Sequence, residues 1–346
     1  MRRFHFLLLC FFLFFIVSCQ KDDNPSASKI TTGVFVANQG KFPDGNGSVT
    51  WLNENTVKET DLFAKNNGGK LLGNTVQSVF FNNGHYFIAV NNAKNIIITD
   101  ETFSEVKSHS LTSLPRYFVA WGKKTIASGW GVNGAKGEII VFNENNDIEK
   151  TIQMDGAPER MLVEGNSLLV CQSNGFSVDK GLAKIDLQTF SLSITQTLSE
   201  GPNSMVRDLS DNIYILCEGY FDWLTSTSYP AALYKWQENT TPTKVLDLPQ
   251  GCTDLCISAS KSICYFHDFN SVYRWKIGDN NAEKINFTVQ PSSIYGLAID
   301  EPNNILYFTD PKDFASQGSV IAADLNKGTI TTFNTGVAPG QIFVRN

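Results

Sequence analysis

Short apolar runs alternate with polar turns along almost the whole chain, and this alternation repeats. In each copy, a turn with Pro or Gly leads into a short apolar strand. A polar turn, a second apolar strand and a variable loop follow before the next strands. Six copies are visible, at residues 75–103, 114–146, 157–190, 201–236, 251–277 and 292–329. Successive copies start roughly 40 to 50 residues apart, a spacing that is typical of four-stranded propeller blades.

The two ends of the repeat region complement each other. Residues 33–63 carry the pattern of a second, third and fourth strand, whereas residues 337–346 supply only a first strand. Joining them completes a seventh blade and closes the ring, which leaves few sheet edges free to aggregate. We therefore predict an all-β fold, a seven-bladed β-propeller over residues 30–346, closed by pairing of the C-terminal strand with the N-terminal strands. An open β-solenoid or two β-sandwiches are the alternatives.

The loops between second and third strands are predicted to carry the function. Strands alternate in direction within a blade, so these loops lie on the same face as the starts of the first strands. They are also the most variable part of the repeats, and variable loops on a rigid scaffold commonly bind ligands. Six of the seven contain an aromatic residue. The ligand-binding residues predicted in these loops are Phe42, Asn91, Asn92, Trp130, Phe176, Tyr220, Phe221, Trp223, Phe269 and Phe314.

The starts of the first strands should surround the axis with polar groups. The ligand-binding residues predicted there are Arg116, Arg160, Asn203, Asp254 and Tyr295. Aromatic side chains in polar loops lower solubility unless something covers them. A ring of aromatic residues around polar groups suits a large, partly flat and partly polar ligand. The alternative for each aromatic residue is that it folds back onto its loop stem. The long loop 218–230 is expected to act as a lid or partner contact.

Composition narrows the classes of function. Aromatic residues make up 12% of the chain and charged residues only 18%, against a typical charged share of about 25%. The net charge is −6 and the pI is near 5.3. Nucleic-acid-binding domains usually show a basic patch, so we predict no nucleic-acid partner.

Motifs for catalysis are mostly absent. The chain has no phosphate-binding Gly-Lys-Ser/Thr, no His-Glu-x-x-His and no Gly-x-Ser-x-Gly, so we predict no enzymatic activity, no cofactor and no metal. One alternative is that Glu159, Asn203 and Asp254, which begin three successive blades, gather oxygen ligands for Ca²⁺ as in lactonase-type propellers. Arg116 and Arg160 argue against it, since they would repel a cation. Another alternative is a module that binds a protein or a glycan.

Isolated histidine and cysteine residues give no strong indication of a further site. His267 ends a second strand close to the loop face, but a lone imidazole is a weak indication of a metal site. Cysteines in the strands are interpreted as small core residues. Cys256 and Cys264 share one hairpin, where they could face each other.

The first 29 residues have the character of an export segment. Arg2 and Arg3 precede an apolar run over residues 4–17, which is shorter than the roughly 20 residues that span a bilayer. We therefore predict a signal peptide over residues 1–18. Residues 16–19 resemble a bacterial lipobox, which implies lipidation of Cys19 and contact with the membrane through acyl chains only. An ordinary signal peptide is the alternative.

Residues 19–29 are predicted to form a flexible, lipidated tether. The stretch from Gln20 to Asn24 resembles the export signal of surface lipoproteins in the bacteroidete group. The resemblance implies that the protein is anchored in the outer membrane and displayed on the cell surface.

A wider resemblance covers the predicted propeller. "GVFVANQGKFPDGNGSVTWLN" (33–53) followed by "VQSVFFNNGHYFIAVNNAKNIIITD" (76–100) resembles the opening of YncE-like propeller surface lipoproteins, and within them the BtuG type of cobalamin-binding protein. The resemblance implies capture of cobalamin or a related corrinoid and delivery to a TonB-dependent outer-membrane transporter. Related propeller lipoproteins serve siderophores or haem, which are alternative ligands. The predicted site residues come from topology and not from this resemblance.

Overall fold

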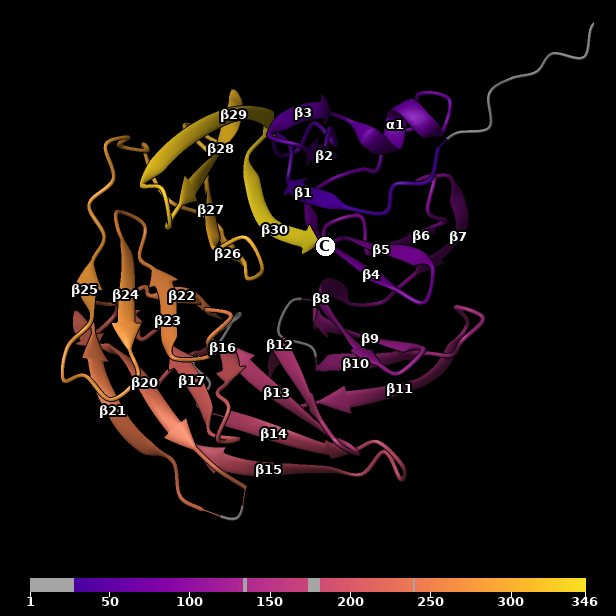
Figure 1. Ribbon diagram of the computed structural model, residues 1–346. Helices are drawn as coiled ribbons and strands as arrows, with labels where there is room; N and C mark the ends of the chain where they lie inside the picture. The colour runs from indigo at the N-terminus through magenta and orange to yellow at the C-terminus, as the bar shows by residue number, and fades with distance from the viewer. Residues whose placement is uncertain (1–27, 133–135, 174–180, 239) are drawn as a thin grey trace, which may run out of the picture.

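The fold is a ring of seven four-stranded antiparallel sheets around a central axis (Figure 1). This computed structural model describes residues 28–132, 136–173, 181–238 and 240–346. The predicted all-β, seven-bladed β-propeller is confirmed. We number the blades 1 to 7 in chain order, starting with the blade that begins at β4. In each blade the first strand lies nearest the axis.

The first three blades follow one another without interruption along the chain. Blade 1 consists of β4 (Val76–Asn82), β5 (His85–Val90), β6 (Asn95–Thr99) and β7 (Glu105–Ser110). Blade 2 consists of β8 (Leu114–Trp121), β9 (Lys124–Trp130), β10 (Gly137–Phe142) and β11 (Ile148–Met154). Blade 3 consists of β12 (Ala157–Glu164), β13 (Ser167–Ser173), β14 (Gly181–Asp186) and β15 (Leu192–Thr197).

The next three blades include an inserted hairpin. Blade 4 consists of β16 (Pro202–Arg207), β17 (Ile213–Cys217), β20 (Ala231–Trp236) and β21 (Thr243–Leu248), with the hairpin β18 (Tyr220–Asp222) and β19 (Thr227–Tyr229) in its second-to-third loop. Blade 5 consists of β22 (Thr253–Ile257), β23 (Ile263–His267), β24 (Val272–Lys276) and β25 (Glu283–Lys284). Blade 6 consists of β26 (Leu297–Asp300), β27 (Ile305–Asp310), β28 (Gln317–Asp324) and β29 (Thr329–Val337).

Blade 7 joins the two ends of the chain, as the half-blade patterns predict. It consists of β30 (Pro339–Arg345), β1 (Gly33–Asn38), β2 (Ser48–Asn53) and β3 (Thr56–Glu59), followed by the short helix α1 (Leu62–Asn66). Strand β30 is antiparallel to β1, with Val34 opposite Val344 and Val36 opposite Ile342. The ring is therefore closed by backbone hydrogen bonds between segments about as far apart in sequence as the chain allows.

The hydrophobic core is divided among the interfaces between blades. Seven clusters of buried side chains occur in the described residues, one for each neighbouring pair of blades. Between blades 7 and 1, the rings of Phe35 and Phe103 stack with centroids 6.1 Å apart, and Tyr86 lies 5.0 Å from Phe35. Strand aromatics thus act as core residues, which leaves the loop aromatics to be explained separately.

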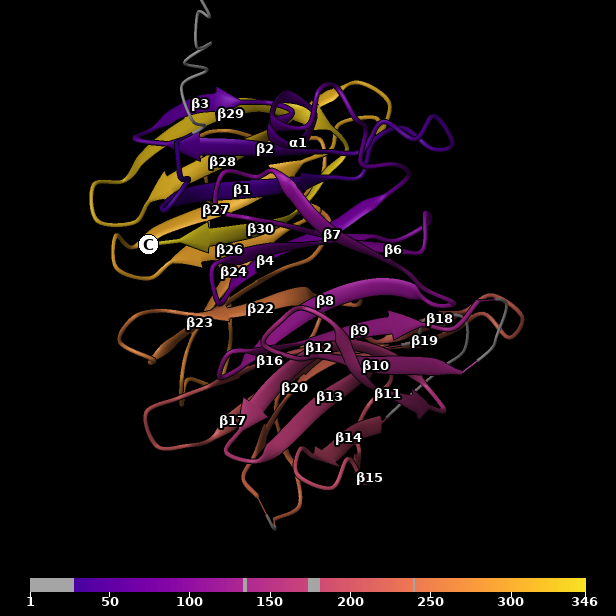
Figure 2. The ribbon, with the colours of Figure 1, turned by 90° about the vertical axis from the view of Figure 1, so that its right-hand side faces the viewer.

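The start of the described chain lies on the face opposite the second-to-third loops. The Ile30 amide donates to the Glu101 carbonyl (2.7 Å) in the turn between β6 and β7, and Arg345 at the end of β30 donates to the Ile30 carbonyl (2.6 Å). Figure 2 shows the separation, with the C-terminus on the left side and the β18–β19 hairpin on the right. The described chain therefore begins on the face away from the loops.

Two further sequence expectations concern single segments. Cys256 lies opposite Tyr265 in the β22–β23 pair, while Cys264 lies opposite Ile257. Both thiols are free, as are the other cysteines in the described part of the chain.

In the described ranges we find no helix with the length and apolar character needed to cross a membrane.

Candidate functional site

The centre of the loop face is built by irregularities in the innermost strands. Six first strands, β4, β8, β12, β16, β22 and β30, show a register shift against their partner within a few residues of their start. A bulge of this kind bends the strand and redirects a side chain. The residues at the shifts are Gln77, Arg116–Tyr117, Glu159–Arg160, Asn203, Asp254–Leu255 and Gly340–Gln341.

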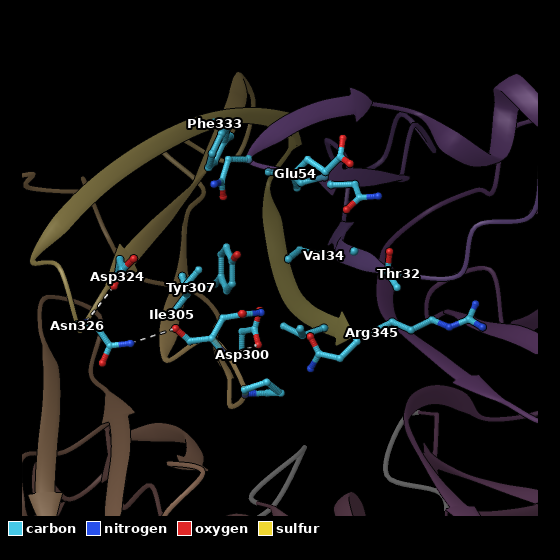
Figure 3. Close-up of a pocket in the computed structure, with 18 of the residues that line it drawn as sticks. Thr32, Val34, Glu54, Asp300, Ile305, Tyr307, Asp324, Asn326, Phe333 and Arg345 are labelled. Atoms are coloured by element: carbon cyan, nitrogen blue, oxygen red, sulfur yellow. Dashed lines mark hydrogen bonds between the residues drawn. The ribbon is translucent and has the colours of Figure 1, made fainter.

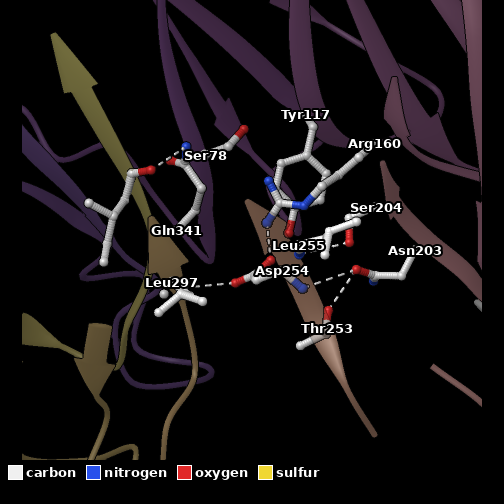
Figure 4. A network of polar contacts seen from close by, with 12 residues as sticks. Ser78, Tyr117, Arg160, Asn203, Ser204, Thr253, Asp254, Leu255, Leu297 and Gln341 are labelled. Carbon is white, nitrogen blue, oxygen red and sulfur yellow. Dashed lines mark hydrogen bonds and ion pairs between the residues drawn. The ribbon is translucent and has the colours of Figure 1, made fainter. Parts of the chain in front are cut away.

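These residues surround a small polar cavity at the end of the propeller axis, which we call the channel mouth. Its volume is about 140 Å³. Figure 4 shows Arg160, Asn203, Asp254 and Tyr117 converging on it from different blades. The lining residues are Gln39, Gln77, Arg116, Tyr117, Glu159, Arg160, Asn203, Thr253, Asp254, His267, Phe269, Tyr295, Gly340 and Gln341. The structure thus brings together Arg116, Arg160, Asn203, Asp254, Phe269 and Tyr295 of the predicted site.

The Arg116 side chain is fully engaged by neighbouring groups. It binds Glu159 through two hydrogen bonds, from Nε (3.0 Å) and Nη2 (2.6 Å), and its Nη1 donates to Gln77 Oε1 (2.8 Å). Its guanidinium carbon lies 4.0 Å from the centroid of the Trp130 ring. Burial alone would lower the pKa of Arg116, but the Glu159 carboxylate outweighs burial and raises that pKa. The sequence predicts Arg116 as a ligand contact, whereas in the structure each of its three nitrogens already donates to a group of the protein.

A second ion pair crosses the mouth from blade 3 to blade 5. Arg160 Nη2 donates to Asp254 Oδ1, and the Arg160 guanidinium carbon lies 4.2 Å from the Tyr117 ring centroid. Asp254 Oδ2 accepts from the Leu297 amide (3.1 Å) and lies 3.4 Å from His267 Nε2. Burial alone would raise the pKa of Asp254. Arg160, His267 and the Leu297 amide together lower it well below its usual value. The carboxylate is therefore ionised at neutral pH.

Around the mouth, the second-to-third loops carry exposed aromatic side chains, which we call the aromatic rim. The exposed fractions are 69% for Phe42, 83% for Trp223, 51% for Phe269 and 42% for Phe314. Phe269 also lines the mouth, and Phe314 makes an edge-to-face contact with Tyr295 at 5.0 Å. These four side chains remain exposed and do not fold back into the core, which was the alternative open from the sequence.

The β18–β19 hairpin presents further apolar surface. Trp223 packs edge-to-face on Phe221 with centroids 4.5 Å apart, and the Tyr220 and Tyr229 rings stack across the hairpin. The adjacent Leu224, which was not predicted as a site residue, is almost completely exposed. The tip therefore resembles a contact surface more than a solvated turn.

Other predicted residues have structural roles or lie outside the described residues. Asn91 is buried and its amide donates to the Pro115 carbonyl (3.0 Å), so it does not reach a ligand on the face. Asn92 is exposed and donates to Thr75 Oγ1 (2.8 Å). Trp130 is half-buried beneath the Arg116 guanidinium. Phe176 and the predicted lipidation site Cys19 lie outside the described residues.

The oxygen-ligand alternative receives no support from this arrangement. The carboxylates of Glu159 and Asp254 face arginines, and the Asn203 carbonyl oxygen accepts from Thr253 Oγ1 (2.6 Å). No group of three or more His, Cys, Asp or Glu in the described residues could hold a metal ion.

A larger cavity of about 640 Å³ lies elsewhere, between blades 6 and 7 on the opposite face (Figure 3). Its carboxylates belong to the turns that form its wall. Asp300 accepts from Asn303, and Asp324 accepts from the Asn326 and Lys327 amides. We therefore interpret this cavity as a groove between blades and take the smaller channel mouth, where side chains from several blades converge, as the candidate functional site.

Comparison with known proteins supports the fold and identifies a family. Residues 32–304 match the model of the family described as "Domain of unknown function (DUF5074)". The chain belongs to the DUF5074 family. No curated protein matches this DUF5074 chain.

Solved structures show the same architecture in proteins with different names. A quinonprotein alcohol dehydrogenase-like protein of Bacteroides thetaiotaomicron aligns with a TM-score of 0.69 and 16% identity, over 92% of this chain and 79% of its own. The periplasmic gluconolactonase PpgL of Pseudomonas aeruginosa aligns with a TM-score of 0.68 and 11% identity, over 91% of this chain and 99% of its own. At such identities the likeness of the DUF5074 propeller to them extends to the fold alone.

Tyr117 was not predicted from the sequence, and His267, which was placed close to the loop face, was not predicted to line the mouth. A signal for the bulges was available, because a Pro follows a small or apolar residue just before the site residues in "LPRY", "APER", "GPNS" and "APGQ". Proline removes a ladder hydrogen bond and is found at bulges and strand starts. The recurrence of this pair marks where four of the inner strands depart from regular pairing.

Proposed function

We propose that this DUF5074 protein is a surface-displayed lipoprotein that captures a corrinoid such as cobalamin, without changing it, and passes it to a TonB-dependent outer-membrane transporter. The observation that carries the proposal is the aromatic rim. Four large aromatic side chains from blades 4 to 7 are exposed on one face around a polar mouth. Aromatic faces contribute contact area at low entropy cost, and polar groups fix the orientation of the ligand.

The geometry suits capture and release outside a membrane. The described chain starts on the face opposite the rim, so a lipidated N-terminus would leave the rim pointing away from the membrane. The mouth offers paired charges and hydrogen-bonding groups, and none of them is arranged as a nucleophile with an adjacent base. Non-covalent binding to such a surface is reversible, which delivery to a transporter requires.

A titration tests the proposal directly. Purified protein is titrated with cyanocobalamin while tryptophan fluorescence is followed, because Trp223 and Trp130 lie at the proposed site and would be quenched. Haem, a ferric siderophore and a soluble glycan are titrated in parallel as alternative ligands, and gluconolactone hydrolysis is measured in the same preparation. Saturable binding of the corrinoid without lactone turnover supports the proposal. Binding of haem, siderophore or glycan in its place contradicts the corrinoid assignment.

Matched variants locate the binding surface. The double variant Trp223→Ala/Phe269→Ala removes two exposed rings and should weaken corrinoid binding at least tenfold, about 1.4 kcal/mol. The control is Leu209→Ala, since Leu209 is also large, apolar and highly exposed but lies in the β16–β17 turn on the opposite face. Equal affinities of the double variant and the control would place the corrinoid site away from the rim.

A further inference from the structure

The carboxylate oxygens and most amide oxygens of the channel mouth already accept hydrogen bonds within the protein, whereas Gln39 Oε1 has no donor among the described residues. Both Glu159 oxygens accept from Arg116, and both Asp254 oxygens have partners in Arg160, the Leu297 amide and His267. The side-chain oxygens of the three amides Asn203, Gln77 and Gln341 are occupied in the same way, by Thr253, Arg116 and the Val79 amide respectively. A ligand donor entering the mouth would therefore meet acceptors that, apart from Gln39 Oε1, already take part in hydrogen bonds.

Several donors of the mouth, in contrast, have no acceptor. Within the described residues, Nη2 is the one Arg160 nitrogen with a hydrogen bond. Nε is buried without a partner in this part of the chain, and Nη1 is not buried. Arg116, by comparison, uses all three of its nitrogens. Asn203 has its amide orientation fixed by the two bonds that its oxygen accepts, and within the described residues its Nδ2 has no acceptor.

The Tyr117 hydroxyl is a further free donor. Its oxygen accepts from Gln77 Nε2 (3.1 Å), so its own proton is available, and the described residues offer it no acceptor. Burial raises the pKa of Tyr117 to about 12, which keeps the hydroxyl protonated at neutral pH. The mouth is thus rich in donors and poor in free acceptors. Such a set of donors recognises a group that bears oxygen acceptors.

The size of the mouth limits what can enter. A cavity of about 140 Å³ corresponds to roughly four or five water molecules at about 30 Å³ each. Pockets that enclose a whole drug-sized ligand measure about 300–1,000 Å³. A macrocycle cannot fit, whereas a single carboxamide, carboxylate or phosphate group can.

We infer that the channel mouth binds one small oxygen-acceptor side arm of the captured ligand, held by Arg160, Asn203 and Tyr117, while the body of the ligand rests on the aromatic rim. Arg160 and not Arg116 is the guanidinium that contacts the ligand. The identity of the body rests on the proposed function, but recognition of the arm follows from the mouth alone and can be tested without a corrinoid.

The first experiment uses small probes. The side-chain ¹⁵N–¹H signals of Arg160 Nε and Asn203 Nδ2 are followed while sodium phosphate or acetamide is added, with assignments from Arg160→Lys and Asn203→Ala. We expect a saturable shift of both signals with at least one probe. The control is Arg207, which ends β16 on the opposite face and pairs with Glu164 at 3.3 Å; its signal should not move. Unmoved Arg160 and Asn203 signals with both probes would overturn the inference.

The second experiment identifies the arm. Cyanocobalamin carries a phosphate and several amides, whereas dicyanocobinamide lacks the phosphate arm. Arg160→Gln should weaken cyanocobalamin binding at least tenfold, and Arg207→Gln should leave it unchanged. Arg160→Lys keeps a positive charge beside Asp254 but lacks the fork of donors. If this variant also loses affinity for cyanocobalamin, the loss comes from missing recognition of the ligand and not from a destabilised mouth. A loss confined to cyanocobalamin identifies a phosphate arm, and an equal loss for both corrinoids identifies an amide.

The two experiments separate the inference from the proposed function. If the wild-type protein binds cyanocobalamin and Arg160→Gln and Asn203→Ala bind it equally well, the inference is wrong and the proposed function stands. If the wild-type protein binds neither corrinoid while the Arg160 signal responds to phosphate or acetamide, the acceptor site stands and the ligand is of another class.

Discussion

Replacement of Arg345 by Ala should weaken the closure of the ring more than the place of this residue near the C-terminal end of the chain suggests. Arg345 Nη1 donates to the Ile30 carbonyl (2.6 Å) and to Tyr86 Oη (2.7 Å), and Nη2 donates to Glu101 Oε1 (2.9 Å). Its guanidinium carbon lies 3.3 Å from the centroid of the Phe81 ring. One side chain therefore connects the last strand to the first described residues and to blade 1.

The expected magnitude follows from this set of contacts. The side chain is 13% exposed, and hydrogen bonds to charged groups contribute about 1.5–3 kcal/mol each before water replaces some of them. We expect a loss of about 3 kcal/mol in the free energy of unfolding, allowing for that replacement. At about 2.1 cal/mol/K per residue over roughly 300 residues, the unfolding entropy is about 0.6 kcal/mol/K, so the melting temperature should fall by about 5 °C.

The assay is differential scanning calorimetry of the wild-type protein, Arg345→Ala and the control Arg274→Ala. Arg274 also makes two hydrogen bonds to one carboxylate, Glu283, but its side chain is 58% exposed. An exposed pair contributes only about 0–1 kcal/mol, so the control should melt within about 2 °C of the wild type. If both variants melt together, Arg345 does not couple the chain ends and the role assigned to it in ring closure is wrong.

Three further predictions concern pH, packing and cysteine chemistry. The pKa of Asp254 is lowered in the folded state, so its ion pair stabilises the protein above the unfolded pKa of about 3.9 and this stabilisation is lost as the pH falls. The melting temperature of the wild type should therefore exceed that of Asp254→Asn at pH 6, by a difference that narrows below about pH 4; a difference independent of pH would refute this. Gly296→Ala should destabilise the fold by about 1–3 kcal/mol in urea unfolding, because an added Cβ would lie 2.1 Å from the Gly340 carbonyl oxygen; unchanged stability would show that the blades can separate there. Cys171, Cys217, Cys252 and Cys264 are buried, and burial raises the pKa of their thiols, to about 12 for Cys252 and Cys264. A thiol reagent at pH 8 should therefore label these four slowly in the native protein and fully in urea, and rapid native labelling of them would contradict their burial.

The fold could be predicted from the sequence because the pattern that specifies each blade is local and repeats along the chain. Each blade has the same order of apolar runs and turns, so six weak patterns reinforce one another. The half-blades at residues 33–63 and 337–346 then specified the closure, which β30 and β1 confirm. Face assignment followed from strand direction alone, and for that reason the positions of Phe42, Phe269 and Phe314 on the loop face could be predicted without coordinates.

Whether the polar groups of each site residue are free or already hydrogen-bonded could not be predicted from the sequence in the same way. Arg116 and Arg160 lie in the bulges at the starts of neighbouring blades, where Arg160 takes the place that Tyr117 has in its own blade. All three Arg116 nitrogens are hydrogen-bonded, whereas only one of the Arg160 nitrogens is hydrogen-bonded within the described residues. The difference depends on which carboxylate faces each arginine. Glu159 of the adjacent blade faces Arg116, whereas Asp254, two blades further on, faces Arg160. Such pairings join residues more than 40 positions apart, and no periodicity in the sequence encodes them.

Binding energy on this face would have to come from the rim and the mouth together. Four rim rings that each lose roughly 100 Å² of exposed surface, at about 25 cal/mol per Å², contribute about 10 kcal/mol. Association costs an estimated 4–15 kcal/mol, so the rim alone leaves little net affinity and no fixed orientation. The mouth charges are already paired, which means that a ligand arm does not have to neutralise a buried ion. The free donors of Arg160, Asn203 and Tyr117 can then add directional hydrogen bonds at small cost, and this makes the acceptor arm the part of the ligand that determines specificity.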